Sequence, residues 1–351
     1  MNLYTFAKPF FFMFLPEQAH TLAITALKYG LIPGSNLPQN SRLSQTLWGL
    51  NFKNPVGLAA GFDKNAEVYK PMLGQGFGFV ETGTVTPLAQ PGNEQPRIFR
   101  LTEDQAVINR MGFNNKGLDY YISQLQKRDP NDGIVGANIG ANKLSEDPIN
   151  DYVIGLERVL GLADYFTINI SSPNTPGLRK LQGREALDEL LSKLKAVREN
   201  AKLEKEPPLI LKIAPDLDDQ ECEDIADIIL KHEMDGLIVS NTTLSRDGLT
   251  SDQKDEAGGM SGKPLFEFST QVLSKMYKLT EGKIPLIGVG GVSNGEEAYA
   301  KIRAGASLVQ LYSALVYHGP SLAEKINLEL NELLRKDGFS NITEATGIDH
   351  K

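Results

Sequence analysis

The 351-residue chain is 41% hydrophobic and 23% charged, which is ordinary for a globular protein of one large or two modest domains. Its net charge of −8 and the lack of a long basic run argue against a nucleic-acid partner. A single cysteine excludes an intramolecular disulfide, and four scattered histidines show no metal-ligand spacing, so no metal site is expected.

The N-terminal region is apolar and helical in pattern. The run from Pro9 to Pro16 is far shorter than the ~20 residues that a membrane span needs. Residues 16–30 then carry apolar side chains at helical spacing. The run either packs on the main body or dips into a bilayer surface as an interfacial helix. A segment rich in Pro, Asn and Ser follows at 31–45, so residues 1–40 are assigned to a helical extension and linker.

Apolar strands then alternate with amphipathic helices along the chain. Strands are predicted at 55–60, 79–86, 133–140, 165–172, 209–215, 236–242, 285–291 and 308–314. Helices are predicted near 66–75, 115–127, 148–161, 184–201, 218–233, 266–280, 294–304 and 320–335. Eight such units match an α/β protein with a (β/α)8 TIM barrel. A doubly wound open sheet is the rival, but no strand is followed by G-x-G-x-x-G.

One irregularity interrupts the alternation. Segments 96–101 and 106–110 flank an acidic turn and predict a β-hairpin inserted at the active-site end of the barrel. We assign the barrel to residues 41–337 and a C-terminal tail to residues 338–351.

Polar or glycine-rich residues follow every predicted strand. The densest group is 169–177, where asparagine, serine and threonine side chains crowd the end of a buried strand. A well-capped turn would explain that stretch alone. Because chemistry in this fold sits at the C-terminal ends of the strands, eight polar ends instead predict one ring-shaped site.

The ring suggests cofactor chemistry. It holds no paired carboxylates, no metal cluster and no Ser-His-Asp set, so a bound organic cofactor is expected to supply the reactivity. The loops after the seventh and eighth strands, at 290–291 and 312–313, and the helix opening near Asn294 suit a phosphate. Lys212 either pairs with Asp216 or stabilises a reduced cofactor. Lys64 suits a substrate carboxylate unless Asp63 neutralises it. Flavin mononucleotide (FMN) fits this set.

The chain resembles dihydroorotate dehydrogenases over nearly its whole length, and it is most similar to the membrane-associated, quinone-reducing class. Nine motifs in order carry the resemblance: 59–64 (AAGFDK), 81–87 (ETGTVTP), 96–100 (PRIFR), 109–114 (NRMGFN), 138–140 (NIG), 169–178 (NISSPNTPGL), 240–243 (SNTT), 261–262 (SG) and 288–291 (GVGG).

The resemblance implies a role for each matching residue. One FMN per subunit would be held by Ala60, Gly61, Lys64, Thr84, Asn138, Asn169, Lys212, Ser240, Gly262, Gly291, Tyr312 and Ser313. The substrate, dihydroorotate, would be surrounded by Lys64, Asn109, Arg110, Met111, Gly112, Phe113, Asn169, Asn174, Asn241 and Thr242. Ser240 stands where relatives often carry threonine, which keeps the hydroxyl.

Ser172 is the base that the resemblance implies, taking a proton from C5 of dihydroorotate. The soluble class has a cysteine there, so serine favours the quinone class. Because a serine hydroxyl is a weak base, we expect a relay through a neighbouring hydroxyl or water. The alternative is that Ser172 only caps the turn and Ser171 does the chemistry.

The resemblance also gives the extension a purpose. Residues 1–30 would bind the membrane surface and form a mouth through which a quinone reaches the flavin, with His20, Arg100 and Tyr312 as candidate polar groups. The alternative for His20 is a solvent-facing position on its helix. The implied protein is a monomer, peripheral on the cytoplasmic side of the inner cell membrane, catalysing the fourth step of de novo pyrimidine (UMP) biosynthesis. Rivals are another FMN barrel that uses NAD(P) or an iron–sulfur partner, and a non-catalytic ligand-binding barrel docked on the membrane.

Overall fold

Eight parallel strands close into a barrel at the centre of the computed structural model, which describes residues 4–35, 38–175 and 177–351. Their spatial order is β10-β12-β13-β3-β4-β7-β8-β9. The strands are β3 (Val56–Leu58), β4 (Phe79–Val85), β7 (Ile134–Ile139), β8 (Tyr165–Asn169), β9 (Leu209–Ile213), β10 (Gly236–Val239), β12 (Leu286–Val289) and β13 (Ala306–Leu311). Each overlaps one predicted strand, so the predicted TIM barrel is confirmed.

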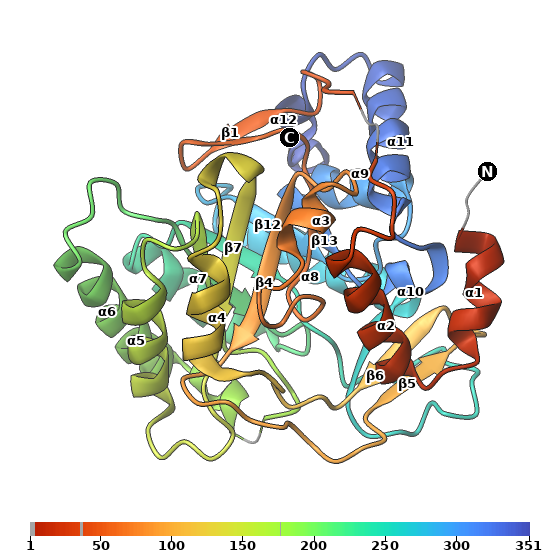
Figure 1. Ribbon diagram of the computed structural model, residues 1–351. Coiled ribbons are helices and arrows are strands. Elements are labelled where there is room, and N and C mark those ends of the chain that lie inside the picture. Colours follow the sequence, from red (N-terminus) through yellow and green to blue (C-terminus); the bar gives the residue numbers. More distant parts are fainter. Residues whose placement is uncertain (1–3, 36–37, 176) are drawn as a thin grey trace.

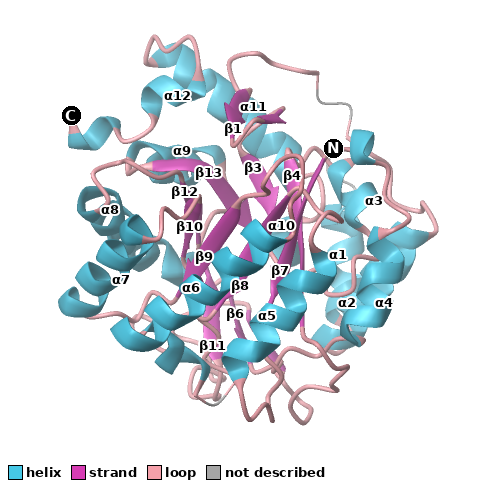
Figure 2. Ribbon diagram, turned by 90° about the vertical axis from the view of Figure 1, so that its left-hand side faces the viewer, coloured by secondary structure: helices cyan, strands magenta, loops and turns pink. Residues whose placement is uncertain are grey.

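Helices surround the barrel, and all eight predicted helices are present (Figures 1 and 2). They are α3 (Tyr69–Leu73), α4 (Gly117–Leu125), α5 (Pro148–Val159), α6 (Arg184–Asn200), α7 (Asp219–Lys231), α8 (Phe266–Leu279), α9 (Gly295–Arg303) and α11 (Leu322–Lys336). Two more, α10 (Ala314–His318) and α12 (Ile342–Ala345), were not predicted, because such short helices show no clear periodicity.

The barrel interior changes from apolar to polar along its axis. At the N-terminal ends of the strands, Phe79 and Tyr165 pack with Phe52 in a fully buried cluster. Phe52 belongs to a hairpin of β1 (Gln45–Leu47) and β2 (Leu50–Phe52), which covers this end in Figure 1. The hairpin was not predicted, because three-residue strands are too short to show alternation. Large side chains fill this end, so only the opposite end has room for a ligand.

Two N-terminal helices, α1 (Tyr4–Phe12) and α2 (Pro16–Lys28), lie against that opposite end. The α2 helix is fastened at both of its ends, by an ion pair of Glu17 with Arg97 at 2.6 Å and one of Lys28 with Glu67 at 2.7 Å. None of the helices within the described ranges is long and apolar enough to cross a bilayer. The helical extension predicted for this region is confirmed from residue 4 onward; residues 1–3 and 36–37 lie outside the described residues.

The predicted hairpin is present as β5 (Ile98–Leu101) and β6 (Ala106–Asn109). A third strand, β11 (Gly259–Gly262), pairs antiparallel with β6 and makes the insertion a three-stranded sheet. The sequence Gly-Met-Ser-Gly has low strand propensity, which explains why β11 was not predicted. Figure 2 shows this sheet at the end of the barrel opposite β1.

The C-terminal tail packs on the outside of the barrel. Its helix α12 begins at Ile342, whose N–H donates to the Arg42 carbonyl at 2.8 Å. Gly347 N–H donates at 3.0 Å to the carbonyl oxygen of Ile302, near the C-terminus of α9. None of residues 338–351 lines the cavity described below, so the tail contributes to packing rather than to the site.

Candidate active site

One cavity of about 810 Å³ opens at the C-terminal ends of the barrel strands and runs outward beneath α1 and α2. Among the predicted site residues it is lined by His20, Ala60, Gly61, Lys64, Thr84, Arg100, Asn109, Met111, Gly112, Phe113, Asn169, Ser172, Asn174, Lys212, Ser240, Asn241, Thr242, Gly262, Gly291, Tyr312 and Ser313. Ser172, Lys64 and Lys212 therefore share one cavity, as the ring-shaped site requires.

Asn138 does not line the cavity and acts one layer behind it. Its Oδ1 accepts hydrogen bonds from Thr84 Oγ1 at 2.6 Å and from Asn169 Nδ2 at 3.2 Å, and both donors belong to lining residues. Asn169 Nδ2 also donates to Thr84 Oγ1 at 2.9 Å. These contacts fix the rotamers of the amide and hydroxyl that face the cavity.

Glu81 is the residue of this layer that the sequence analysis missed. Its buried carboxylate accepts from Asn138 Nδ2 at 2.7 Å, from Gln310 Nε2 at 2.8 Å and from the Tyr165 hydroxyl at 3.2 Å. A carboxylate in the middle of the strand Phe79–Val85 was the available signal, because carboxylates are rarely buried without several donors. Glu81 thereby sets the orientation of the Asn138 amide.

Lys212 ends β9 as a buried cation with no hydrogen bond or ion pair to any described residue. The alternative pairing with Asp216 does not occur, because Asp216 Oδ2 pairs with Arg179 Nη1 at 2.9 Å. Burial lowers the pKa of Lys212, and the negative charge of Glu81 raises it again in part. An ammonium in this position favours a ligand that carries or gains negative charge.

Lys64 is also free of a carboxylate partner among the described residues. Its Nζ donates to Gly61 O at 2.8 Å, while Asp63 accepts from the N–H groups of Glu67 and Val68, both at 2.7 Å. Asp63 therefore shapes its own loop and makes no ion pair with Lys64. Burial lowers the pKa of Lys64 to about 8 and raises that of Asp63 to about 6. The ammonium remains available to a substrate carboxylate.

The two adjacent serines have different environments. Ser171 Oγ donates to Asn169 Oδ1 at 2.9 Å and accepts from Asn241 Nδ2 at 2.9 Å, so it is committed to the framework. Ser172 Oγ accepts only the Asn174 N–H, at 3.2 Å, and lines the cavity. Its proton has no acceptor among the described residues. The geometry thus favours Ser172 over Ser171 as the reactive hydroxyl.

The expectation that the helix opening at Asn294 binds a phosphate is wrong. The first N–H groups of α9 are already used: Glu297 N bonds Asn294 Oδ1 at 2.8 Å, and Gly295 N bonds Glu329 Oε2 at 2.7 Å. Ser293 N donates to the Glu297 carboxylate at 2.7 Å. Two carboxylates at this helix terminus would repel an anion.

The two loops of the predicted phosphate site, at 290–291 and 312–313, keep free backbone donors. Within the described residues, the N–H groups of Gly291 and Ser313 make no hydrogen bond, and both residues line the cavity. Gly291 has φ +79°, and a Cβ there would lie 2.5 Å from Phe266 Cα, so only glycine fits. The hydroxyls of Ser261 and Ser313 lie 2.7 Å apart beside it. The two free N–H groups, together with the unpaired Lys212, fit a phosphate-bearing cofactor with a flat, carbonyl-rich ring.

Arg110 does not direct its charge into the cavity. Its guanidinium pairs with Glu256 at 2.7 Å and lies over the Phe99 ring at 4.5 Å from the centroid. The neighbouring Asn109 does line the cavity, and its Oδ1 accepts from Asn174 Nδ2 at 3.4 Å. Side chains alternate in direction along β6 and its continuation, which explains why Asn109 faces the cavity and the next residue, Arg110, faces away from it.

The outer part of the cavity is apolar and aromatic. The His20 ring packs edge-on against Phe62 at 5.2 Å and lies 6.3 Å from the Tyr312 ring, so His20 faces the cavity and not solvent. Burial, reinforced by the charge of Lys64, lowers the pKa of His20 to about 3. The imidazole is therefore neutral at physiological pH and can accept or donate one hydrogen bond without adding charge.

Arg100 closes the far side of this outer part. Its Nη2 donates to Phe14 O at 2.6 Å, and its guanidinium lies over the Phe12 ring at 4.7 Å from the centroid. Burial lowers the pKa of Arg100. The arginine thus ties the hairpin to α1 and places one polar group in an apolar wall.

The first prediction concerns the ion pair between Glu17 and Arg97, which holds α2 in place against the cavity. Replacing Arg97 with methionine should lower the free energy of unfolding by about 1–3 kcal/mol, because Glu17 and two carbonyl oxygens lose a buried charged donor. Thermal unfolding and limited proteolysis after residue 14 measure the effect. Arg158→Met, which breaks an exposed pair with Asp119, should cost less than about 1 kcal/mol; an equal loss would contradict the assigned role of Arg97.

Comparison with known proteins finds relatives that match nearly the whole chain. The model of the family described as dihydroorotate dehydrogenase matches residues 42–334. A protein of Azorhizobium caulinodans named dihydroorotate dehydrogenase (quinone) is 52% identical, covering 99% of both chains. A protein of the same name from Rhizobium rhizogenes is 56% identical, covering 95% of this chain and 92% of the relative. The crystal structure of DHODH from Eimeria tenella in complex with ferulenol superposes with a TM-score of 0.93 at 43% identity, covering 96% of each chain.

Proposed function

The chain belongs to the dihydroorotate dehydrogenase family, and on that premise we propose that it oxidises dihydroorotate to orotate and reduces a membrane quinone, in the fourth step of de novo pyrimidine biosynthesis. One observation carries the proposal. A single cavity joins a polar end, with Ser172 and two lysines, to an apolar arm beneath α1 and α2. The test is direct: the purified protein should be yellow and should bleach anaerobically when dihydroorotate is added. A colourless protein, or one that stays yellow, would refute the proposal.

We propose FMN as the cofactor, one per protein. The groups that fit it are the Gly291 and Ser313 N–H groups for the phosphate, and Lys212 with the cavity-lining side chains of Asn169 and Thr84 for the ring. Ala60, Gly61, Ser240, Gly262 and Tyr312 complete this set, with Asn138 acting through Thr84 and Asn169. Bound FMN supplies a two-electron acceptor that gains negative charge on reduction.

The chain's own residues hold the substrate and move its proton. Lys64 would pair with the substrate carboxylate, and the side chains of Asn109, Asn174 and Asn241 would bind its ring amides and carbonyls. Met111, Gly112, Phe113 and Thr242 would complete the pocket. Ser172 would accept the C5 proton, because its hydroxyl faces the cavity without a committed donor bond. Removing water from this pocket strengthens each of these electrostatic contacts.

A proton taken by Ser172 needs an onward acceptor. Thr175 lies in the same loop, and its buried Oγ1 has no hydrogen-bond partner among the described residues. A buried hydroxyl without a partner is uncommon and points to an unseen water. We therefore infer a relay from Ser172 through a water to Thr175. Pro176 of this loop lies outside the described residues.

The second prediction concerns Lys212. Its replacement by methionine removes the buried cation beside the cofactor, so the two-electron midpoint potential of bound flavin should fall by about 30 mV or more, equivalent to about 1.4 kcal/mol. Potentiometric titration of the holoenzyme measures it. Lys301→Met is a matched control, because Lys301 is another buried lysine, bonded to Ser269 at 2.8 Å and outside the cavity lining. An unchanged potential in Lys212→Met would refute the role of Lys212.

We propose that the extension docks the protein on a membrane. Large apolar side chains of α1, α2 and the turns beside them are exposed, including Phe6, Phe10, Met13, Leu15 and Leu22. Exposed apolar groups on adjacent helices favour insertion into the headgroup region. Residues 1–40 would be the docking extension, 41–337 the catalytic barrel and 338–351 the tail of a monomer on the cytoplasmic side of the inner cell membrane. His20, Arg100 and Tyr312 would face the quinone path.

A further inference from the structure

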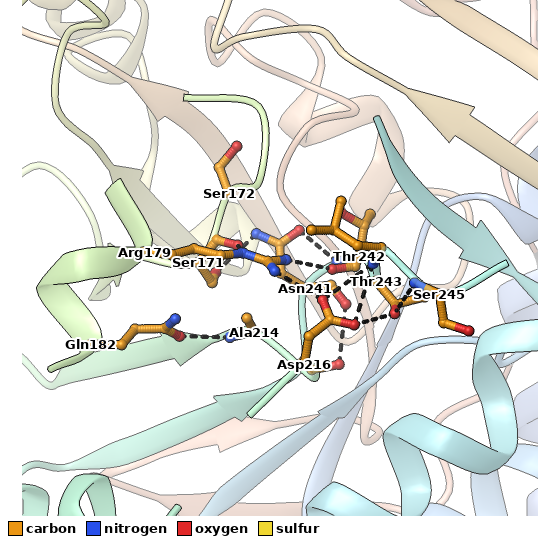
Figure 3. Close-up of polar contacts among 12 residues, drawn as sticks. Ser171, Ser172, Arg179, Gln182, Ala214, Asp216, Asn241, Thr242, Thr243 and Ser245 are labelled. Atoms are coloured by element: carbon orange, nitrogen blue, oxygen red, sulfur yellow. Dashed lines mark hydrogen bonds and ion pairs between the residues drawn. The ribbon is translucent and has the colours of Figure 1, made fainter. Parts of the chain in front are cut away.

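Arg179 links the segments that follow three neighbouring strands of the barrel (Figure 3). Its Nε donates to Ser171 O at 3.1 Å, its Nη1 pairs with Asp216 Oδ2 at 2.9 Å, and its Nη2 donates to Thr242 O at 3.1 Å. These partners follow β8, β9 and β10 respectively. One planar guanidinium therefore fixes the relative positions of three strand ends.

Asp216 extends the same network. It accepts hydrogen bonds from the Thr243 hydroxyl and from the Leu244 N–H, the latter at 3.2 Å. Nearby, Gln182 Oε1 accepts from Ala214 N at 2.9 Å, which ties the short helix that carries Arg179 to the end of β9. Figure 3 shows Thr243 beside Asp216, and the contact of Gln182 with Ala214 to one side of the ion pair. Hydrogen bonds thus hold the network on the Asp216 side, through Thr243 and Leu244, and on the Arg179 side, through Gln182.

The network holds the framework serine but not the reactive one. Asn241 Nδ2 donates to Ser171 Oγ at 2.9 Å, inside the cluster. In Figure 3 the side chain of Ser172 points away from the cluster, and Ser172 lines the cavity. A shift of the Ser171 carbonyl would therefore move Ser172 relative to Asn241 and Thr242. In the proposed function Ser172 takes the proton, and Asn241 and Thr242 hold the substrate.

Geometry, more than stability, is what this ion pair supplies. Both side chains are partly exposed, at 22% for Arg179 and 23% for Asp216, and ion pairs at such exposure contribute little free energy of folding. An arginine fork nevertheless directs several N–H groups at fixed angles, which a lysine ammonium does not. We propose that the Arg179–Asp216 pair is a clamp that positions Ser172 against the substrate-binding residues of the β10 loop. This proposal rests on the proposed function, because it takes Ser172 to be the base.

The rate of flavin reduction by dihydroorotate, measured anaerobically by stopped flow on the holoenzyme, tests the clamp. Arg179→Met should slow it roughly 10²-fold, the cost of a displacement of about 1 Å at a reacting group. Flavin content should stay near that of the unchanged protein. Arg179→Lys should recover only part of the rate, because it keeps the charge and loses the fork. Arg179→Lys also serves if the methionine variant does not fold.

The pH profile of the same reaction separates positioning from a loss of stability. Arg179→Met removes the ion-pair partner of Asp216 and leaves Arg246 as a nearby cation, so the profile should move to higher pH, and Asp216→Asn should move it to lower pH. The double variant should restore the profile but not the rate. The cations that line the same cavity as Ser172 are unchanged throughout: Lys64, Arg100, Lys212 and Lys263.

Arg128→Met is the matched control, because Arg128 and Asp164 form a partly buried pair at the N-terminal ends of the strands. It should lower the thermal stability and leave flavin reduction within about twofold of the unchanged protein. A full rate in Arg179→Met, or equal losses in Arg179→Met and Arg128→Met, would overturn the clamp. Failure of the unchanged protein to bleach with dihydroorotate would instead refute the proposed function, and the clamp with it.

Discussion

Replacing Ser172 with alanine should slow the reduction of bound flavin by dihydroorotate roughly 10²–10⁴-fold, the usual contribution of a positioned general base. The expected loss follows from the surroundings of the hydroxyl. Ser172 Oγ lines the cavity and accepts only one backbone N–H, so no other described residue is placed to substitute for it in the same loop. Stopped-flow spectroscopy under anaerobic conditions measures the rate, and flavin absorbance should show that the cofactor is still bound.

Ser171→Ala is the matched control for Ser172→Ala. It removes two hydrogen bonds of 2.9 Å each, one to Asn169 and one from Asn241, so thermal stability should fall. The rate of flavin reduction should fall much less than it does in Ser172→Ala. Thr175→Val should give a smaller loss than Ser172→Ala, because water can replace part of a relay. Flavin reduction at a near-normal rate in Ser172→Ala would exclude Ser172 as the base.

The barrel was predictable because its signal is local and repeated. Strands such as Gly236–Val239 are buried on both faces, so they read as continuous apolar runs between amphipathic helices. The position of the site followed from the same pattern, since the C-terminal ends of parallel strands converge. The assignment of single residues depended on the family resemblance, because no local pattern separates Ser171 from Ser172.

Long-range contacts were not predictable. The carboxylate of Glu329, which lies on α11, 34 residues from Gly295, occupies a donor at the N-terminus of α9, and nothing near Asn294 predicts that contact. Arg110 turns away from the cavity because Glu256 and Phe99 are placed beside it by the inserted sheet. The Arg179–Asp216 pair left Lys212 without an anion, although Asp216 is nearer to Lys212 in sequence. In each case a residue distant in the sequence determines which group is paired and which remains free, and the local sequence does not show this.

Removal of residues 1–30 should abolish turnover with a long-chain quinone and spare flavin reduction by dihydroorotate. The physical reason is that α1 and α2 wall the apolar arm, with His20 facing Phe62 and Tyr312, while the polar end lies among the strand ends. Without these helices a hydrophobic acceptor has neither a membrane contact nor an enclosed path. Steady-state turnover with quinone in vesicles, beside anaerobic flavin reduction, measures both halves.

Two comparisons show which property of the extension matters. A small water-soluble acceptor should still be reduced by the truncated protein, because it needs no apolar path. In the full chain, Phe10→Ser with Met13→Ser removes exposed apolar groups, so vesicle binding should fall while turnover with detergent-solubilised quinone persists. Docking and passage would then be separate duties of the same two helices. Quinone turnover that survives the deletion unchanged would place the quinone path elsewhere, and the exposed apolar face of α1 and α2 would then need another explanation.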